Sequence, residues 1–461
     1  MPELTGSAHD GPAHDGPAPS GRGKMNNAFD PATAAGLDDE TRTLVERRQR
    51  LLGPAYRLFY TRPVEVVRAR GVLLYDRDGR DYLDAYNNVV SVGHAHPRVT
   101  EAISAQLGTL CTHTRYLQPG ILDYAEDLLG THSGRIGRRG HAMFTCTGSE
   151  ANDLALRMAR HHTGKRGVIV TAEAYHGNSD LTAGISPSLG EGSPLDPWVR
   201  RVPAPDSYRR PASGLGTWLA GQVAAQIGDL ERRGDGVAAF IADSLFSSDG
   251  IYATPTDVLG PVAKVIRHAG GLFVADEVQS GFGRSGERLW GYQRHGLDPD
   301  IVTMGKPMGN GMPIAGVVAR HEVLEDFGRA ARYFNTFGGN PVCVAAAAAV
   351  LDILESEDLP ANAAATGAYL KAEISGFGSG SLAGVRGAGL YLGVDVIDPG
   401  TGKPSGDRAA AIVNGMRDRR VLISATGPLG HTLKIRPLLP FSRQNADQLL
   451  SALSGVLGQP D

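Results

Sequence analysis

The chain has 461 residues, with 46 Lys and Arg against 49 Asp and Glu and a formal net charge of −3. This near-neutral balance argues against nucleic-acid binding, which usually leaves a basic face, and no charge run points to a membrane surface. Three cysteines without a C-x-x-C pair indicate a reducing compartment and no structural zinc, so we expect a cytoplasmic protein without a metal site.

The N-terminal residues 1–38 repeat the sequence HDGPA and contain few large apolar side chains. Such a segment buries too little apolar surface to offset its ordering entropy, so we predict a disordered tail. From residue 39 the pattern becomes globular. Three short strands are expected before residue 95, at 64–70, 72–75 and 81–84. We assign residues 39–95 to the N-terminal part of a small domain.

Between residues 96 and 340, helical stretches alternate with short apolar runs. The runs expected to form strands are 143–145, 168–171, 237–242, 272–275 and 301–304. Helices are expected between them, for example at 150–162 and 259–268. This alternation predicts an α/β fold with a mostly parallel sheet covered on both faces. We assign residues 96–340 to a large domain.

The C-terminal part, residues 341–461, starts with a long helix for which Asn340 is the expected N-cap and Pro341 the first-turn residue. Further strands are expected at 390–396, 421–424 and 432–435. These patterns are typical of a smaller α+β domain. We therefore expect both ends of the chain to contribute to one small domain.

The first chemical feature is the start of the helix after strand 143–145, in the stretch TCTGSEAN. Free N–H groups at a helix N-terminus, a close-approach glycine at Gly148 and the Ser149 hydroxyl would form a good phosphate cradle. An ordinary capped helix start explains the same residues equally well.

The second feature is a pair of strand ends. The apolar strand at 272–275 runs into Asp276, and the strand at 301–304 is followed by Gly305 and Lys306. The carboxyl ends of parallel strands meet at the ligand crevice of an α/β sheet. A phosphate cradle, an aspartate and a lysine at one crevice are what pyridoxal 5′-phosphate requires. Lys306 would form the Schiff base, and Asp276 would keep the pyridine nitrogen protonated.

A series of motifs gives the chain a family resemblance. FTCTGSEAN, TAEAYHGN, FVADEVQSGFGRSG, PDIVTMGKPMGNGMPIAG and FNTFGGNP resemble, in this order, the motifs of class III pyridoxal-phosphate aminotransferases. The resemblance covers roughly residues 60–455. It implies fold type I, with a seven-stranded type of sheet, and a homodimer whose active sites lie at the subunit interface. The implied substrate is a small amine or amino acid.

The same resemblance implies contacts to the cofactor. Lys306 corresponds to the Schiff-base lysine and Asp276 to the partner of the pyridine nitrogen, while Gly148 and Ser149 would hold the phosphate. The other implied contacts are Tyr175 stacked on the ring, His176 beside it, Val278 packed on the ring, Gln279 near the phenolic oxygen, Asp243 at the site, and Thr336 reaching the phosphate of the neighbouring subunit.

Within the family, the chain looks most similar to the branch of ethanolamine-phosphate and phosphohydroxylysine phospho-lyases, which also includes relatives of alanine–glyoxylate aminotransferase. Two departures bear on the reaction. Many transaminases bind 2-oxoglutarate with an arginine where this chain has Lys434, a point charge without a bidentate fork. The gating segment has Phe246 and Ser248 in place of a glutamine and a glutamate.

Three reactions stay open, and all would pass through an external aldimine from whose α-carbon Lys306 removes a proton. We favour transamination, because it is the commoner chemistry of the superfamily. Elimination of phosphate from a phosphorylated amine is the alternative. Oxygen-dependent oxidation or decarboxylation of an amino acid is a minority alternative. The candidate substrate-binding residues are Asn87, Asn88, Ser91, Arg115, Phe246, Lys434 and Arg436.

Overall fold

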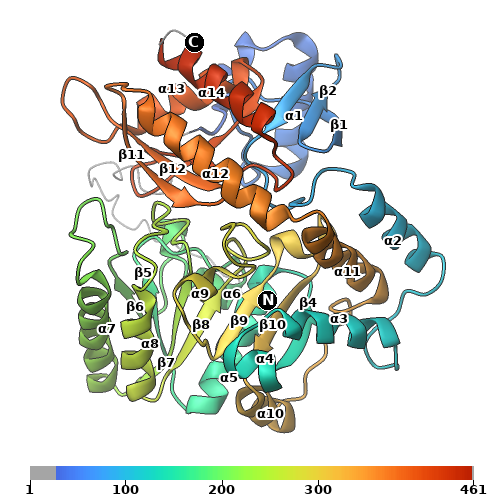
Figure 1. The fold of residues 1–461 in the computed structure, drawn as a ribbon, viewed down its shortest axis with the longest axis vertical. Helices are drawn as coiled ribbons and strands as arrows, with labels where there is room; N and C mark the ends of the chain where they lie inside the picture. The colour runs from blue at the N-terminus through green and yellow to red at the C-terminus, as the bar shows by residue number, and fades with distance from the viewer. Residues whose placement is uncertain (1–26, 459–461) are drawn as a thin grey trace, which may run out of the picture.

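The computed structural model describes residues 27–458 and has two stacked parts (Figure 1). The lower part contains a seven-stranded sheet with helices on both faces, and the upper part contains two four-stranded sheets with their own helices. The predicted α/β fold, with a mostly parallel sheet in one part and an α+β arrangement in the other, is confirmed.

The seven-stranded sheet has the order β4-β10-β9-β8-β7-β5-β6. Its strands are β4 (His141–Thr145), β10 (Ala315–Ala319), β9 (Ile301–Met304), β8 (Leu272–Asp276), β7 (Val237–Asp243), β5 (Gly167–Thr171) and β6 (Val199–Val202). Only β10 runs against its neighbours, β4 and β9. Our sequence-based strands did not include β10 and β6, which are short and lie in glycine- and proline-rich surroundings.

Alternate residues of the buried strands face two different hydrophobic cores. Phe240 and Phe273 belong to the core shared with α7 (Leu215–Arg232) and α8 (Leu259–His268), whereas Ile241 belongs to the core shared with α5 (Gly148–Thr163). Because neighbouring side chains of a strand point to opposite faces, a strand covered on both faces is apolar throughout. This explains the continuous apolar runs from which these strands were predicted.

The upper part combines the two ends of the chain (Figure 1). Its first sheet has the order β1-β2-β3-β13 and its second the order β11-β12-β15-β14. The strands are β1 (Val66–Arg70), β2 (Leu73–Asp76), β3 (Asp81–Asp84), β13 (Val421–Leu422), β11 (Leu382–Ala388), β12 (Tyr391–Val396), β15 (Thr432–Ile435) and β14 (Ser424–Thr426). The parallel pair of β3 and β13 joins residues more than 300 positions apart.

The remaining helices surround these sheets. They are α1 (Asp39–Leu52), α2 (Pro97–Leu107), α3 (Pro119–Gly130), α4 (Gly134–Arg139), α5 (Gly148–Thr163), α6 (Asp180–Ala183), α9 (Gly291–Arg294), α10 (His321–Ala330), α11 (Pro341–Ser356), α12 (Leu359–Gly376), α13 (Gly406–Asp418) and α14 (Arg443–Leu457), with short 3-10 turns η1 (Pro31–Gly36), η2 (Pro187–Leu189) and η3 (Lys306–Gly309). Asn340 caps α11 as predicted, since its side chain accepts from the Cys343 N–H. Within residues 27–458, no helix is long and apolar enough to cross a membrane.

The predicted disordered tail is wrong for residues 27–38. Phe29 is buried, the Asn27 side chain donates to the Ser424 hydroxyl at 3.2 Å, and residues 31–36 form the turn η1. The low-complexity rule failed here because one aromatic side chain and one amide are enough to attach a polar segment to an existing core. The rest of that prediction, residues 1–26, lies outside the described residues.

Candidate active site

A cavity of about 200 Å³ lies at the carboxyl ends of β7, β8 and β9. It is lined by Gly148, Ser149, Asn152, Tyr175, His176, Asp243, Asp276, Val278, Gln279 and Lys306. All cofactor residues expected from the sequence, except Thr336, therefore line one cavity. Asn152 lines it as well, and we had assigned it no role although it belongs to the TGSEAN motif.

The strand register explains why these residues meet. Asp243 at the end of β7 is paired with Asp276 at the end of β8, which is paired with Thr303 near the end of β9. Lys306 follows β9 at the start of η3 and has a backbone φ of 22°, in the region that favours glycine. The tight turn after Gly305 thus keeps the lysine at the same edge of the sheet as the two carboxylates.

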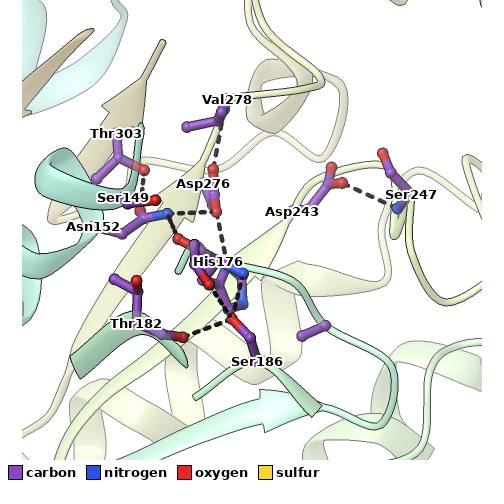
Figure 2. A network of polar contacts seen from close by, with 12 residues as sticks. Ser149, Asn152, His176, Thr182, Ser186, Asp243, Ser247, Asp276, Val278 and Thr303 are labelled. Atoms are coloured by element: carbon purple, nitrogen blue, oxygen red, sulfur yellow. Dashed lines mark hydrogen bonds and ion pairs between the residues drawn. The ribbon is translucent and has the colours of Figure 1, made fainter. Parts of the chain in front are cut away.

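Asp276 lies at the centre of a buried polar network (Figure 2). Its Oδ2 accepts from Asn152 Nδ2 at 2.9 Å and lies 2.7 Å from His176 Nδ1, while its Oδ1 accepts from the Val278 N–H at 3.0 Å. The Thr303 hydroxyl donates to Asn152 Oδ1 at 2.6 Å and so fixes the amide. Three polar contacts therefore hold in place a carboxyl group that is 4% exposed.

Lys306 has an amine that is easier to deprotonate than an ordinary lysine. Burial and the nearby Arg436 guanidinium lower its pKa to about 8, although Asp276 and Asp243 act in the opposite direction. A substantial fraction of the amine is consequently neutral near physiological pH. A neutral lysine amine can act as a nucleophile and as a base.

The start of α5 forms one wall of the cavity. Thr147 caps the helix by accepting from the Glu150 N–H, and the Ser149 hydroxyl donates to Asn178 Oδ1 at 3.0 Å. A Cβ atom on Gly148 would lie 2.9 Å from a methyl group of Val278, so only glycine fits without movement of that side chain. The free N–H groups of this first turn point toward the cavity end of the helix, as an anion cradle requires.

Gln279, which lines the cavity, contacts residues from both ends of the chain. Gln279 Oε1 accepts from Arg436 Nη1 at 2.6 Å and from the Tyr391 hydroxyl at 3.1 Å. Arg436 Nε in turn donates to the Tyr86 carbonyl at 2.8 Å, and its guanidinium lies 4.4 Å from the centre of the Tyr86 ring. We did not predict Tyr86 and Tyr391 as site residues, because they belong to no motif and meet Gln279 only in the folded chain.

Lys434 is a buried lysine near the same cavity. It is 8% exposed, its Nζ lies 5.9 Å from the Tyr391 ring centre, and it has no hydrogen-bond or ion-pair partner among residues 27–458. Burial and the positive charges of Arg436 and Lys306 lower its pKa well below the usual value, although Asp243 favours the charged form. A buried lysine of this kind favours the neutral amine, and an anion beside it would favour the charged ammonium.

Two of the predicted residues outside the cavity lining, Thr336 and Arg115, are exposed. Thr336 is exposed on the segment before α11, and Arg115 is exposed with its guanidinium 3.9 Å from the Phe334 ring centre. Arg115 lines a separate hollow of about 400 Å³, together with residues of the 114–125 and 333–338 segments. Their predicted roles toward a neighbouring subunit or a substrate stay predictions.

The other predicted substrate residues surround the site without lining the cavity. Asn87 Oδ1 accepts from the Val89 N–H and therefore closes a local turn. Asn88 Nδ2 and Ser91 Oγ are buried without a partner among the described residues. Phe246 is 1% exposed and packs in the hydrophobic core, with a backbone φ of 51°. Phe246, which stands where the family's gating segment has a glutamine, therefore contributes to packing at this position.

Comparison with known proteins agrees with this geometry. The family described as aminotransferase class-III matches residues 59–457. An ethanolamine-phosphate phospho-lyase homolog 1 from Caenorhabditis elegans is 37% identical over 93% of this chain and 96% of its own. An alanine–glyoxylate aminotransferase 2-like protein from Drosophila melanogaster is 37% identical over 89% of this chain and 86% of its own. A solved phospholyase from Arthrobacter in complex with phosphoethanolamine is 44% identical, with a TM-score of 0.87, over 91% of this chain and all of its own.

The cavity residues fit pyridoxal 5′-phosphate, the cofactor of this family. Asp276 is buried, and its ion-pair partner among the described residues is the His176 imidazole, whose Nε2 has no hydrogen-bond partner there. A protonated ring nitrogen of the cofactor would give Asp276 a cationic partner, and the N-terminus of α5 suits the cofactor phosphate. The described residues contain no group of three or more His, Cys, Asp or Glu that could hold a metal ion.

Proposed function

Because the chain belongs to the class III aminotransferase family, whose cofactor is pyridoxal 5′-phosphate, we propose that it eliminates phosphate from a small phosphorylated amine. The observation that supports this choice is the buried Lys434, which has no ion-pair partner among residues 27–458 and lies near Arg436 and Lys306. A phosphate monoester has about two negative charges at neutral pH, more than a carboxylate has, so it gains more from this group of cations. The phospho-lyase relatives support the same choice. This choice reverses our preference from the sequence, in which transamination was ranked ahead of phosphate elimination.

The residues of the cavity have distinct roles in this proposal. The bound cofactor supplies an electron sink for the carbon that bears the substrate amine. Asp276, held by Asn152 and His176, would stabilise positive charge at the ring nitrogen. Gly148 and Ser149 would hold the cofactor phosphate at the start of α5, and Tyr175 and Val278 line the cavity that would take the ring.

Lys306 moves the proton in the elimination. The C–H bond on the amine-bearing carbon breaks, and the Lys306 amine takes the proton. The electron pair of the broken C–H bond then expels phosphate from the neighbouring carbon, and phosphate leaves with the electron pair of the C–O bond. Return of a proton to the second carbon and addition of water then yield an aldehyde and ammonia.

Lys434 binds the phosphate group of the substrate. An incoming anion favours the charged ammonium, which burial and neighbouring cations otherwise disfavour. The proton that Lys434 gains also neutralises part of the charge that develops on the leaving phosphate. Binding and departure of the phosphate therefore involve the same side chain.

The test uses the purified holoenzyme with phosphoethanolamine, with ethanolamine as the unphosphorylated control. We expect stoichiometric release of phosphate, ammonia and aldehyde from the phosphorylated substrate, and none from ethanolamine. Glyoxylate or pyruvate should not change the rate, because an elimination needs no amino acceptor. Release of no phosphate, combined with transfer of the amino group to glyoxylate, would contradict the proposal, as would oxygen uptake that matches substrate loss.

Transamination is the second candidate, supported by the identity to the alanine–glyoxylate aminotransferase 2-like protein. It would use the same lysine and aspartate, but no phosphate would be expelled and the amino group would pass to an acceptor such as glyoxylate. Lys434 would then bind a carboxylate. The two candidates separate in one assay, in which a series of amino acids and phosphorylated amines is tested for new amino acids formed from glyoxylate.

The assembly that we propose is a homodimer in which Thr336 of each chain contributes to the site of the other. Apolar side chains are exposed near the hollow that contains Arg115, with Leu117 at 99% and Phe337 at 69% exposure. A second copy of the chain would cover them. In sedimentation experiments the wild type should be a dimer, whereas the Phe337→Asp variant should dissociate into monomers. A monomeric wild-type protein with full activity would contradict this assembly.

A further inference from the structure

The orientation of the Gln279 amide is determined by its neighbours. A guanidinium has only donors, so the Gln279 atom 2.6 Å from Arg436 Nη1 must be the oxygen. The Tyr391 hydroxyl donates to the same oxygen at 3.1 Å, and burial raises the pKa of Tyr391 to about 12, so that its proton is retained. Two donors on Oε1 thus exclude the flipped amide, which would place N–H groups against N–H and O–H groups.

The other end of the amide is left for the cavity. Gln279 is 9% exposed and lines the cavity with Asp243, Asp276 and Lys306. Within residues 27–458, no hydrogen bond involves its Nε2, although both donors on the opposite side are engaged with its oxygen. The amide therefore presents two N–H hydrogens to whatever occupies the cavity.

Arg436 is itself held in place. Its Nε donates to the Tyr86 carbonyl at 2.8 Å, its backbone N–H donates to the Ala85 carbonyl at 2.9 Å, and it is 6% exposed. Its guanidinium thus connects the strand end before Tyr86 to Gln279, across the boundary between the two stacked parts. A side chain with this many fixed contacts orients a neighbour more strictly than a flexible lysine would.

We infer that Arg436 and Tyr391 are positioning residues, which hold Gln279 as a hydrogen-bond donor to the anionic phenolic oxygen of bound pyridoxal phosphate. Arg436 consequently acts on the cofactor through an amide and not as a direct ligand of the substrate. A donor at this oxygen stabilises the negative charge that remains when the visible chromophore loses its proton. Loss of the donor should therefore raise the pH at which the absorbance changes.

The test is a titration of the visible absorbance of holoenzyme between about pH 6 and 10, without substrate. Gln279→Leu and Arg436→Met should each raise the midpoint by about one pH unit, which is the scale of one hydrogen bond to a charged group. Arg436 also contributes a positive charge, whose loss would shift the midpoint in the same direction. The double variant with Gln279→Leu separates this charge effect from the effect of positioning the amide.

The double variant separates positioning from charge. If Arg436 acts through the amide, the double variant of Gln279→Leu with Arg436→Met should shift by less than the sum of the two single shifts. Fully additive shifts would overturn the inference. Should Arg436→Met fail to fold, Arg436→Lys and Tyr391→Phe provide the comparison, with smaller shifts of the same sign expected and unchanged midpoints contradicting it. The readout needs no turnover, so it is independent of which substrate bond is broken.

Discussion

One group of residues lines the cavity and a second group lies behind Gln279, and the two are built in different ways. The strand-end group, Asp243, Asp276 and Lys306 with Asn152 and His176, comes from neighbouring parallel strands and their loops. The cation group, Lys434 and Arg436 with Tyr86 and Tyr391, comes from the two ends of the chain. The first group has a fully hydrogen-bonded carboxylate, whereas the second has surplus positive charge. In the roles that we propose, the first group and Arg436 serve the cofactor, whereas Lys434 serves the substrate anion.

The strongest way to test the strand-end group is Lys306→Ala. Without the amine that removes the proton, we expect activity to fall by at least about 10³-fold, because general-base catalysis contributes on the order of 10²–10⁴ and the lysine also holds the cofactor. The rate of phosphate release measures this, and circular dichroism checks the fold. Lys264→Met, at an exposed position of α8, is the control and should keep wild-type activity. Comparable rates for the two variants would contradict the assignment.

The cation group should respond differently. Lys434→Met should raise KM for a phosphorylated amine by about 10- to 100-fold, since a hydrogen bond to a charged group contributes roughly 1.5–3 kcal/mol. The visible spectrum of the holoenzyme should be retained, because Lys434 does not line the cofactor cavity.

Lys434→Arg provides the charge-conserving comparison for this position and should recover part of the affinity. A changed spectrum with an unchanged KM would place Lys434 in the cofactor site and remove the distinction between the two groups.

Asn152→Ala tests how Asp276 is held. The change removes a donor from Asp276 and leaves the Thr303 hydroxyl and the His176 carbonyl without their partner. We expect a loss of about 1–3 kcal/mol in the free energy of unfolding, measured with urea, and weaker binding of pyridoxal phosphate. Thr303→Val removes only one hydroxyl and should cost less. Equal stability of Asn152→Ala and wild type would show that water replaces the amide.

The smallest expected effect concerns the pKa of Lys306 in the strand-end group, which Arg436 of the cation group lowers. Lys306 must lose its proton to react with added pyridoxal phosphate, so the rate of cofactor loading into the apoenzyme should rise with pH and level off above about pH 8. Arg436 is one of the groups that lower this pKa. Arg436→Met should therefore move the midpoint of the loading rate to higher pH. A midpoint near the usual lysine value of about 10.4 in wild type would contradict the burial argument.

Sequence reasoning reached the strand-end group because its order is local. Apolar strands ending in Asp276 and followed by Lys306, and a helix starting at Gly148, imply a common edge once the sheet is parallel. It missed Asn152, although one helical turn from Gly148 places that amide on the inner face of α5. A buried polar residue that close to a phosphate cradle is the signal that could have identified it.

Sequence reasoning identified only part of the cation group. Lys434 and Arg436 were noted as departures from a motif, but the sequence did not indicate that Arg436 binds Gln279 while Lys434 is left without a partner. Nothing in the sequence pointed to Tyr86 or Tyr391. Arg115 was placed in the substrate pocket by a short motif, and in this chain it lies in a different hollow.

The sequence by itself determined the family, the cofactor and the strand ends at which the chemistry takes place, because hydrophobic periodicity and short motifs are local properties of the chain. The tertiary structure decided which charges face the cofactor and which are left for a substrate. That distinction depends on side chains more than 150 residues apart, such as Gln279 and Arg436, whose hydrogen bond has no trace in either local pattern. Burial of the cations without counter-charge is likewise a property of the packed molecule alone.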